Sequence, residues 1–238
     1  MLTISIVSHN QLPIMYDLIT ELLKNINYKI IITINIEEDE TLLNNLPTEN
    51  LKIIKNKKPV GFPENHNNAF RYCSTDYFLI LNPDVLLNND LVDNTLNLMI
   101  EKEISILSPL AVSHEGTVLD NSRRFPKIYT PFLRLFSSKY KSDYQFSNDS
   151  IHEVDWISGM FIMIESSLYR DLDGFDERFF LYYDDVDLCK RVHQHGSSVY
   201  LTSKYTVIHE GNRLSKKSLK YFLIHIVSLL KYHLKHGL

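Results

Sequence analysis

The chain has 238 residues, of which 44% are hydrophobic and 23% charged, so we expect a folded core and exclude an intrinsically disordered protein. Its formal net charge of −4 argues against a general nucleic-acid-binding protein. Two cysteines, Cys73 and Cys189, are too few for a disulfide framework or a cysteine-ligated zinc site, and they fit the reduced thiols of a cytoplasmic protein. Residues 1–10 lack the features of a signal peptide, and no apolar run is long enough to span a bilayer.

Apolar runs and helix-like segments alternate through the first half of the chain. Runs rich in β-branched and apolar residues predict buried strands at Leu2–Ser8, Tyr28–Ile34, Leu51–Lys55, Tyr77–Leu81 and Ile104–Leu107. Helical spacing predicts helices from Pro13 to about Asn25, at Pro63–Tyr72 and at Leu91–Glu101. This alternation predicts an α/β fold with a mostly parallel sheet flanked by helices, in which ligands bind beyond the carboxyl ends of the strands.

The second half has weaker periodicity. A turn is expected at Glu115-Gly116, and residues 123–150 form a polar and aromatic stretch of a kind that is often functional or mobile. The apolar run Val154–Ile164 is broken by Ser158-Gly159, which predicts a bulge or a close approach of the backbone to a ligand. Two short strands are expected at Val199–Leu201 and Thr206–Ile208.

The stretch from Gly174 to Arg191 combines acidic and aromatic side chains. Its carboxylates include Asp176, Asp184, Asp185 and Asp187, and its rings are Phe179, Phe180, Tyr182 and Tyr183. A helix is expected to begin at Asp184 or Asp185 and to end before Gly196. Free N–H groups at a helix N-terminus keep carboxylates ionised. The two aspartates therefore either cap this helix or project into a ligand cleft, and the adjacent rings favour the cleft.

Two residues at strand ends are candidates for a divalent metal site. Asp84, in the turn Asn82-Pro83-Asp84, follows a hydrophobic strand, and hard oxygen ligands suit Mg²⁺ or Mn²⁺. His209 ends another strand, and its imidazole as a second ligand would favour Mn²⁺. The alternative is that the first feature is only a turn and the second only a structural histidine.

Groups that suit a nucleotide or a sugar lie in two further places. Gly61-Phe62 precedes a helix start rich in amides, where Asn65, Asn67 and Asn68 either contact an anionic ligand or cap the helix. Arg123-Arg124 either holds a phosphate or is an exposed pair. No GxGxxG follows a strand and no GxxxxGK[ST] occurs, which excludes the usual dinucleotide site and a P-loop.

The C-terminal region is basic and amphipathic. A helix is expected over Leu219–Leu234, with one broad apolar face: Leu219, Phe222, Leu223, Ile226, Val227 and Leu230. No acidic residue follows Glu210, whereas this region contains Arg213, Lys216, Lys217, Lys220, Lys231 and Lys235. Such a helix either packs on the protein or docks on an anionic membrane surface, and the sequence leaves both open.

Taken together, these motifs resemble the inverting GT-A glycosyltransferases of family 2, and among them the bacterial rhamnosyltransferases that extend O-antigen or related polysaccharides. The segments that carry the resemblance are VSHN, VGFPENHNNAF, LNPDV, NSRRFP, VDWISGMF, GFDERFFLYYDDVDLCKR and VIHEG. The resemblance implies a GT-A domain over residues 1–212, with a nucleotide-binding half at about 1–110 and an acceptor half at about 111–212. The basic amphipathic helix over residues 213–238 would follow it.

The resemblance also implies roles for individual residues. Asp185 would be the catalytic base, and Asp84 with His209 would bind Mg²⁺ or Mn²⁺. The donor nucleotide sugar would be contacted by Ser8, Asn10, Asn35, Gly61, Asn67, Asn82 and Arg124. The acceptor would be contacted by Trp156, Gly159, Tyr183 and Asp184. A base of ordinary pKa would suffice, because the attacking hydroxyl becomes acidic only as the new bond forms.

By the same resemblance, the reaction would move L-rhamnose from dTDP-L-rhamnose to a saccharide that is linked to a polyprenyl diphosphate. It would take place in the cytoplasm or at the cytoplasmic face of the membrane. Membrane contact through the C-terminal helix stays open beside packing on the protein, and the net charge of −4 predicts no nucleic-acid partner. Two departures stand on the nucleotide side: Asn35 replaces an Asp of the family, and Pro59 replaces an Asn. They keep open a donor with another base, such as a UDP-hexose or UDP-galactofuranose.

Two alternatives come from other functional classes. A sugar-phosphate nucleotidyltransferase would also bind nucleotide and Mg²⁺, but it would normally carry a glycine-rich loop, which Ser8–Pro13 lacks. A non-catalytic sugar-binding or scaffold protein could share the fold. That scaffold would have no need of Asp84, Asp185 and His209 together, and metal-dependent nucleotide binding without turnover would identify it.

Overall fold

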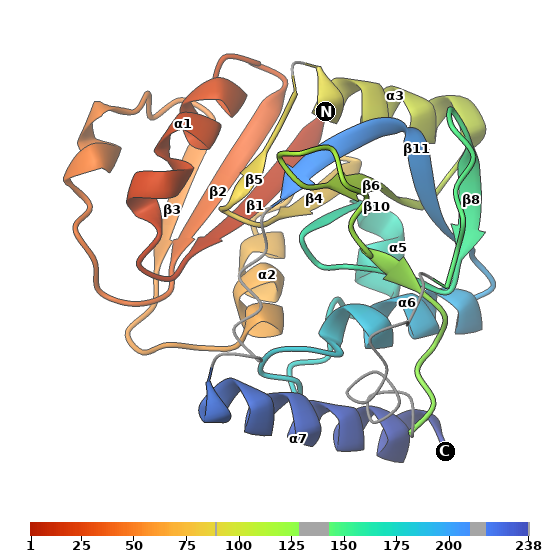
Figure 1. The fold of residues 1–238 in the computed structure, drawn as a ribbon. Helices are drawn as coiled ribbons and strands as arrows, with labels where there is room; N and C mark the ends of the chain where they lie inside the picture. Colours follow the sequence, from red (N-terminus) through yellow and green to blue (C-terminus); the bar gives the residue numbers. More distant parts are fainter. Residues whose placement is uncertain (89, 129–142, 210–217, 238) are drawn as a thin grey trace.

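A computed structural model of the chain describes residues 1–88, 90–128, 143–209 and 218–237 (Figure 1). Within these residues, a nine-stranded sheet has the order β3-β2-β1-β4-β10-β6-β11-β5, with β8 paired to β11. Its strands are β1 (Leu2–Ser8), β2 (Tyr28–Ile34), β3 (Leu51–Lys55), β4 (Tyr77–Leu81), β5 (Val85–Leu86), β6 (Ile106–Val112), β8 (Ile151–Val154), β10 (Phe161–Glu165) and β11 (Val199–His209). A separate pair joins β7 (Ser122–Arg123) to β9 (Trp156–Ile157).

Helices cover both faces of the sheet (Figure 1). They are α1 (Leu12–Leu22), α2 (Phe62–Phe70), α3 (Leu91–Lys102), α5 (Ser166–Asp171), α6 (Asp184–Gln194) and α7 (Leu219–His236), with a 3₁₀ turn η1 (Thr41–Asn45). Apolar residues of α1 and α3 pack on one face of the sheet, and those of α2, α5 and α6 pack on the other. The result is the three-layer α/β sandwich with a largely parallel sheet that the alternating pattern predicts.

Side-chain alternation along β1 explains how the two layers form. Leu2, Ile4 and Ile6 are buried in the core cluster that contains α1 and α3. The intervening polar side chains point to the other layer, where Ser5 Oγ lies 2.8 Å from His66 Nδ1 of α2. Because successive residues of a strand face opposite sides, this one strand anchors helices on both faces.

The strands β1 to β4 begin and end where the sequence predicts, but two later strand predictions are wrong. The strand expected at Ile104–Leu107 is β6 at Ile106–Val112, because Ile104 N still donates to Met99 O and closes the end of α3. The two short strands expected between 199 and 208 are one strand, β11, with a register shift between Thr202 and Thr206. A bulge there lets the strand pair with β6 along both of its halves.

Helix α7 forms where it is expected, but the face that packs is a different one. Its buried residues are Ser228, Leu229, Tyr232 and His233, and the predicted apolar face is largely exposed. The start of the expected C-terminal segment, residues 213–217, lies outside the described residues. No helix in the described ranges is both long and apolar enough to cross a membrane.

Candidate active site

The first half of the candidate site lies at the tip of β4. The turn Asn82-Pro83-Asp84 leads directly into β5, whose antiparallel pairing sets Val85 opposite His209 at the end of β11. This register brings Asp84 Oδ1 to 3.3 Å from His209 Nε2. Burial raises the pKa of the Asp84 carboxyl, but the His209 imidazole outweighs this effect and holds that pKa below its ordinary value. Asp84 is therefore ionised at neutral pH.

The second half of the site is a pair of carboxylates at the start of α6. Asp184 is 4% exposed, and the neighbouring Asp185 accepts hydrogen bonds from Gly159 N at 3.0 Å and Val186 N at 2.8 Å. Burial raises the pKa of both carboxyls, and the charge of Asp185 raises that of Asp184 further. The N–H donors and the Arg123 guanidinium act in the opposite direction on the pKa of Asp185.

The groups around the two aspartates affect their pKa values differently. The two buried carboxyls raise the cost of ionising both at once, and the N–H donors of Gly159 and Val186 favour the charged form of Asp185. We therefore expect Asp185 to ionise at lower pH than Asp184. The raised pKa contrasts with the ordinary carboxylate that the sequence suggests, because the sequence does not reveal how deeply α6 buries its first turn.

A short turn connects the two halves. Met160 O accepts a hydrogen bond from Asn82 N at 2.9 Å, and the preceding residue, Gly159, donates to Asp185. A Cβ at Gly159 would lie 3.2 Å from Phe62 Cζ and 3.8 Å from Asp185 Cβ, so the turn is closely packed against α2 and α6. The break at Ser158-Gly159 thus brings the Asp84 turn and the Asp185 carboxylate to the same place.

The loop before α6 has an unusual backbone. Tyr182 and Tyr183 have φ values of 67° and 62°, a region that costs energy for bulky side chains. Helix α7 holds this loop: Ser228 Oγ donates to Leu181 O at 2.8 Å, and the His225 ring lies 5.2 Å from both tyrosine rings. Contacts from α7 thus stabilise the strained turn from which Asp184 and Asp185 project.

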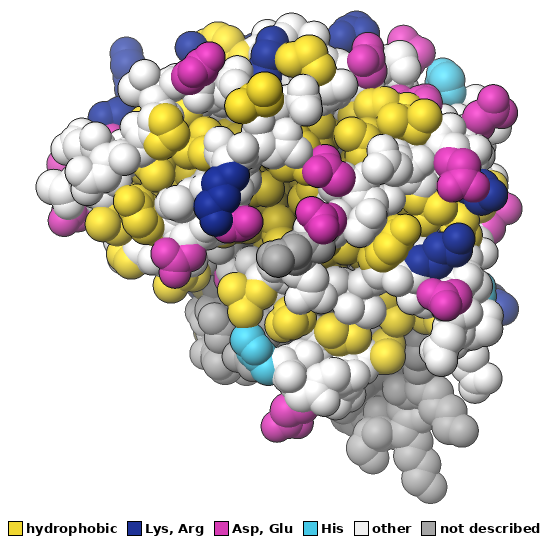
Figure 2. Space-filling model, turned by 90° about the horizontal axis from the view of Figure 1, so that it is seen from above, with side chains coloured by type: hydrophobic (Ala, Val, Ile, Leu, Met, Phe, Trp, Pro, Cys, Tyr) yellow, Lys and Arg dark blue, Asp and Glu magenta, His cyan; other side chains and the backbone are white. Residues whose placement is uncertain are grey.

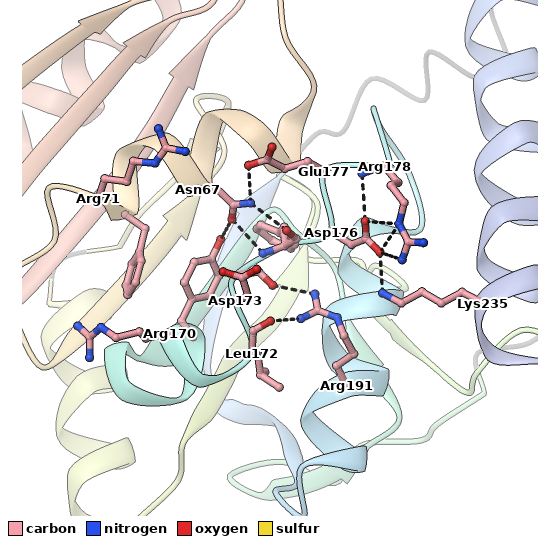
Figure 3. A pocket seen from close by; sticks show the side chains of 14 residues that line it. Asn67, Arg71, Arg170, Leu172, Asp173, Asp176, Glu177, Arg178, Arg191 and Lys235 are labelled. Atoms are coloured by element: carbon pink, nitrogen blue, oxygen red, sulfur yellow. Dashed lines mark hydrogen bonds and ion pairs between the residues drawn. The ribbon is translucent and has the colours of Figure 1, made fainter.

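A buried charge cluster fixes the other end of α7 to α6. Asp187, which is fully buried, pairs with Arg191 Nε at 2.8 Å, Lys235 Nζ at 2.6 Å and His236 Nε2 at 2.7 Å. Lys235 also pairs with Asp176 at 2.7 Å (Figure 3). Burial raises the pKa of Asp176, but Arg178 and Lys235 lower it by more, so its net shift is downward.

Residues around this cluster line a pocket of about 640 Å³ between α2, α5 and the loop after α5 (Figure 3). Asn67 lies at its edge, where its Oδ1 accepts from Tyr169 Oη at 2.7 Å and from Phe175 N at 2.9 Å. Its Nδ2 donates to Phe175 O at 2.8 Å and to Glu177 Oε1 at 3.0 Å. The Asn67 amide therefore ties α2 to the loop that leads to Asp184.

Residues 3–170 match the family described as Glycosyl transferase family 2. The chain belongs to glycosyltransferase family 2. Rhamnosyltransferase WbbL of Escherichia coli K12 is 28% identical to it, over 98% of this chain and 92% of that protein. N-acetylglucosaminyl-diphospho-decaprenol L-rhamnosyltransferase of Mycobacterium tuberculosis is 26% identical over 63% of this chain, and the match spans only 52% of that protein.

The fold of this glycosyltransferase is that of GT-A enzymes. The mannosyltransferase PcManGT of Pyrobaculum calidifontis, solved with GDP-Man and Mn²⁺, covers 100% of this chain and 65% of its own, with a TM-score of 0.65 and 13% identity. An identity this low supports the shared fold alone. The GT-A architecture implied by the sequence motifs is thereby confirmed.

The donor set at the strand tip fits a divalent ion. Asp84 Oδ1 and His209 Nε2 are both buried, and apart from their 3.3 Å contact with each other neither has a hydrogen-bond partner within the described residues. A carboxylate and an imidazole suit Mn²⁺ or Mg²⁺ when the oxygens of a diphosphate supply further ligands. Nowhere in the described part of the chain do three or more His, Cys, Asp or Glu side chains gather as metal ligands, so substrate oxygens or water would have to complete the coordination.

Other residues predicted to contact the donor lie at the tips of β1 and β2. Ser8 ends β1 and accepts from Gln11 N through Oγ at 3.0 Å, and Asn10 adopts a φ of 63° in the next turn. Asn35 N donates to Ser8 O at 2.9 Å. The side-chain amide of Asn35 binds His9, Asn56 and both backbone groups of Val60. Asn35 thus shapes the loop that leads to Gly61, and its donor contact stays a prediction.

The acceptor residues are spread over the other half of the site. Trp156 lies in β9, and its Nε1 donates to Arg124 O at 3.1 Å. Arg124 itself is exposed, whereas the adjacent Arg123 is the arginine whose charge reaches Asp185. Tyr183 is 8% exposed and packs in a small cluster with Phe179 and α7. The structure thus brings Gly159 to Asp185 at the start of α6, and Trp156 packs against the cluster that contains Tyr183.

The residues that position this loop were not predicted from the sequence. Phe62 N donates to Phe180 O at 2.9 Å, which joins the start of α2 to the aromatic run. Lys235 and His236 contact Asp187 from almost 50 residues further along the chain. The spacing of Asp187 and Arg191 at i and i+4 was an available signal for one ion pair. No short-range sequence pattern indicates the contacts that α7 makes with Asp187.

Proposed function

We propose that this glycosyltransferase transfers L-rhamnose from dTDP-L-rhamnose to a saccharide acceptor during the assembly of a cell-surface polysaccharide. The observation that carries the proposal is the match to an E. coli rhamnosyltransferase over 98% of the chain. A second relative is also named as an L-rhamnosyltransferase. The site supports the reaction type, because an ionisable buried aspartate and a metal-suited strand tip lie on either side of one short turn.

In the proposed mechanism, Asp185 accepts the proton of an acceptor hydroxyl while the oxygen of that hydroxyl attacks the anomeric carbon of the donor. The bond to the diphosphate breaks on the opposite face, so one displacement inverts the configuration, and β-linked rhamnose becomes α-linked. The Gly159 and Val186 N–H groups orient the Asp185 carboxylate. When Mg²⁺ or Mn²⁺ is held by Asp84 and His209, it supplies electrostatic stabilisation for the departing diphosphate.

The acceptor we propose is linked to a polyprenyl diphosphate. The mycobacterial relative is named for a decaprenol-linked acceptor, although this chain spans about half the length of that protein. A lipid-linked acceptor would hold the reaction at the cytoplasmic face of a membrane, with the enzyme in peripheral contact. The half-buried Trp156 would then contribute an apolar wall for the sugar.

The test is donor hydrolysis and transfer across dTDP-rhamnose, UDP-glucose, UDP-galactose and UDP-galactofuranose, each with Mn²⁺, Mg²⁺ or EDTA. Slow hydrolysis by water needs no acceptor, so it reports on the donor site alone. We expect metal-dependent release of dTDP from dTDP-rhamnose above all other donors. The combination of no release and no nucleotide binding would contradict the proposal and favour a scaffold protein.

A second candidate donor is a UDP-sugar on the same site. The observation that favours it is Asn35, whose amide is engaged by Asn56 and Val60. The resemblance to the family implies an Asp at this position, so the amide would change the nucleotide side of the site. Metal-dependent release of UDP in the same donor screen would support the same mechanism with a UDP-sugar as the donor in place of dTDP-L-rhamnose.

A further inference from the structure

Helix α7 exposes a continuous apolar face. Six of its large apolar side chains are between 43% and 87% exposed: Leu219, Phe222, Leu223, Val227, Leu230 and Leu234. Their spacing of three, four or seven residues places them on one side of the helix. At about 1.5 Å per residue, this face extends over roughly 25 Å. An apolar surface of this length on a single helix is typical of an interaction site.

The orientation of this face is fixed by the opposite side of the helix. Leu229 and Tyr232 are buried against the loop before α6, Ser228 binds Leu181 O, and Lys235 pairs with the buried Asp187. These contacts distribute along the helix from its middle to its C-terminal end. The apolar face is thus turned outward by a packed, ion-paired interface, and α7 cannot rotate to bury it without breaking that interface.

The charge of α7 distinguishes between possible partners. Residues 218–237 contain Lys220, Lys231 and Lys235 and no acidic residue. Lys235 pairs with Asp176 and Asp187, and Lys231 donates to Arg178 O, so the exposed Lys220 is the one of these lysines available to a partner. In a symmetric dimer through this face, each helix would meet a second copy of itself, and Lys220 would find no carboxylate on the partner helix. An anionic lipid surface complements both the apolar side chains and the exposed Lys220.

The rest of the surface differs from this face. The side of the molecule opposite α7 mixes acidic, basic and apolar side chains (Figure 2). Helix α7 lies along one end of the molecule, next to the elements that carry the aspartate pair (Figure 1). A protein that lay on a membrane through α7 would therefore have its catalytic loop close to the lipid surface.

We propose that the apolar face of α7 docks on an anionic bilayer, with the helix lying in the plane of the interface. The same helix holds the catalytic loop through its other side, so docking places Asp184 and Asp185 next to an acceptor whose lipid tail lies in that bilayer. The identity of the acceptor rests on the proposed function, whereas the docking surface rests on α7 alone.

The experiment is vesicle flotation of the full chain with phosphatidylcholine vesicles and with vesicles that contain equal phosphatidylcholine and phosphatidylglycerol. The test variant carries Leu223→Gln, Val227→Gln and Leu230→Gln. The matched control carries Ile14→Gln, Ile26→Gln and Val118→Gln, three apolar residues that are 59%, 80% and 56% exposed elsewhere. Circular dichroism checks that both variants are folded.

We expect the wild type and the control to float with anionic vesicles, and the α7 variant to bind at least about tenfold more weakly. The reason is that three apolar side chains, even partly buried in the bilayer, contribute more than about 1.4 kcal/mol to binding. Lys220→Glu should weaken binding to anionic vesicles about fivefold and leave binding to neutral vesicles unchanged. Equal flotation of the α7 variant and wild type would overturn the proposal, as would the absence of wild-type binding.

Two further readouts separate this proposal from its rivals. Analytical ultracentrifugation of the same variants detects self-association, and a wild-type dimer that the α7 substitutions dissociate would assign the face to a second copy and overturn the bilayer. Donor hydrolysis, which needs no membrane, should be the same in the α7 variant and wild type. Vesicle binding without hydrolysis of any donor would remove the proposed function and leave the docking surface standing.

Discussion

The two carboxylate sites of this glycosyltransferase are built in different ways. Asp84 projects from the tip of a buried strand, and the β5–β11 register places His209 beside it. Asp185 lies in the first turn of α6, and the loop before this helix contains two tyrosines at positive φ and is held by α7. The sheet therefore determines one site, and a contact between residues 47 positions apart, Leu181 and Ser228, supports the other.

This difference predicts which substitutions should affect each site. Changes in α7 should disturb Asp185 and leave the Asp84 turn intact, because α7 touches the loop before α6 and the sheet does not depend on it. Changes at the strand tip should affect donor binding and leave the stability of the loop unchanged.

Replacement of the proposed base should have the largest effect. Asp185→Asn keeps the shape of the side chain and removes its ability to accept a proton, so turnover should fall about a thousandfold. Donor affinity, measured by calorimetry with dTDP and Mn²⁺, should change less than about threefold, because the Asp84 side is untouched. Asp90→Asn, the same change at an exposed aspartate, serves as control. Turnover of Asp185→Asn near that of wild type would remove Asp185 as the base.

Loss of the buried charge cluster should destabilise the base side specifically. Asp187→Ala leaves Arg191, Lys235 and His236 without their shared carboxylate, and we expect a loss of about 3 kcal/mol in the free energy of unfolding. Urea denaturation measures this loss. The control is Arg178→Gln, whose 70% exposed side chain pairs with Asp176 and should contribute less than about 1 kcal/mol. Equal effects of the two substitutions would contradict a buried cluster.

Removal of the strand-tip carboxylate should affect the metal and not the fold. Asp84→Asn weakens the only pair of groups we assign to the metal, so turnover at limiting Mn²⁺ should fall about a hundredfold. The midpoint of urea denaturation should stay within about 0.2 M of wild type. Turnover measured as a function of Mn²⁺ concentration shows whether the substitution weakens metal binding. A wild-type metal response in Asp84→Asn would place the ion elsewhere.

The contact between the two halves can be tested at Gly61. A Cβ there would lie 2.7 Å from Phe180 O and 2.9 Å from Phe180 Cα, both backbone atoms that cannot move independently. Gly61→Ala should therefore cost about 1 to 2 kcal/mol of stability and lower turnover, since it separates α2 from the loop before α6. Lys58→Ala, an exposed position in the same loop, is the control. An unchanged Gly61→Ala protein would show that this contact is not needed.

The sequence predicted much of the sheet-built half because its determinants are local. The strands β1 to β4 are short apolar runs with polar residues at their ends, so both their bounds and the position of Asp84 follow from the pattern. The start of α6 at Asp184 followed from the same kind of signal. The link from β5 to β11, which brings in His209, depended on resemblance to a family, because strand pairing leaves no local trace.

The helix-built half was harder to predict for a physical reason. The face of α7 that packs contains Ser228, Tyr232 and His233, whereas hydrophobic periodicity points to the face that is exposed. Hydrogen bonds and ion pairs, such as that between Lys235 and Asp187, hold this helix in place. Polar contacts of this kind have no periodicity to detect, and their partners lie far apart in the sequence.

The pH dependence of donor turnover in Asp184→Asn tests most directly that Asp185, and not Asp184, is the catalytic base. Burial raises the pKa of Asp185, so the wild-type rate should rise with pH through that raised pKa and be lost as pH falls through it, above the range of an exposed carboxyl. Because Asp184 holds its proton, replacing it with a neutral amide should keep turnover within about tenfold and keep the same acid limb. Loss of turnover in Asp184→Asn, with activity retained in Asp185→Asn, would contradict the assignment and make Asp184 the base.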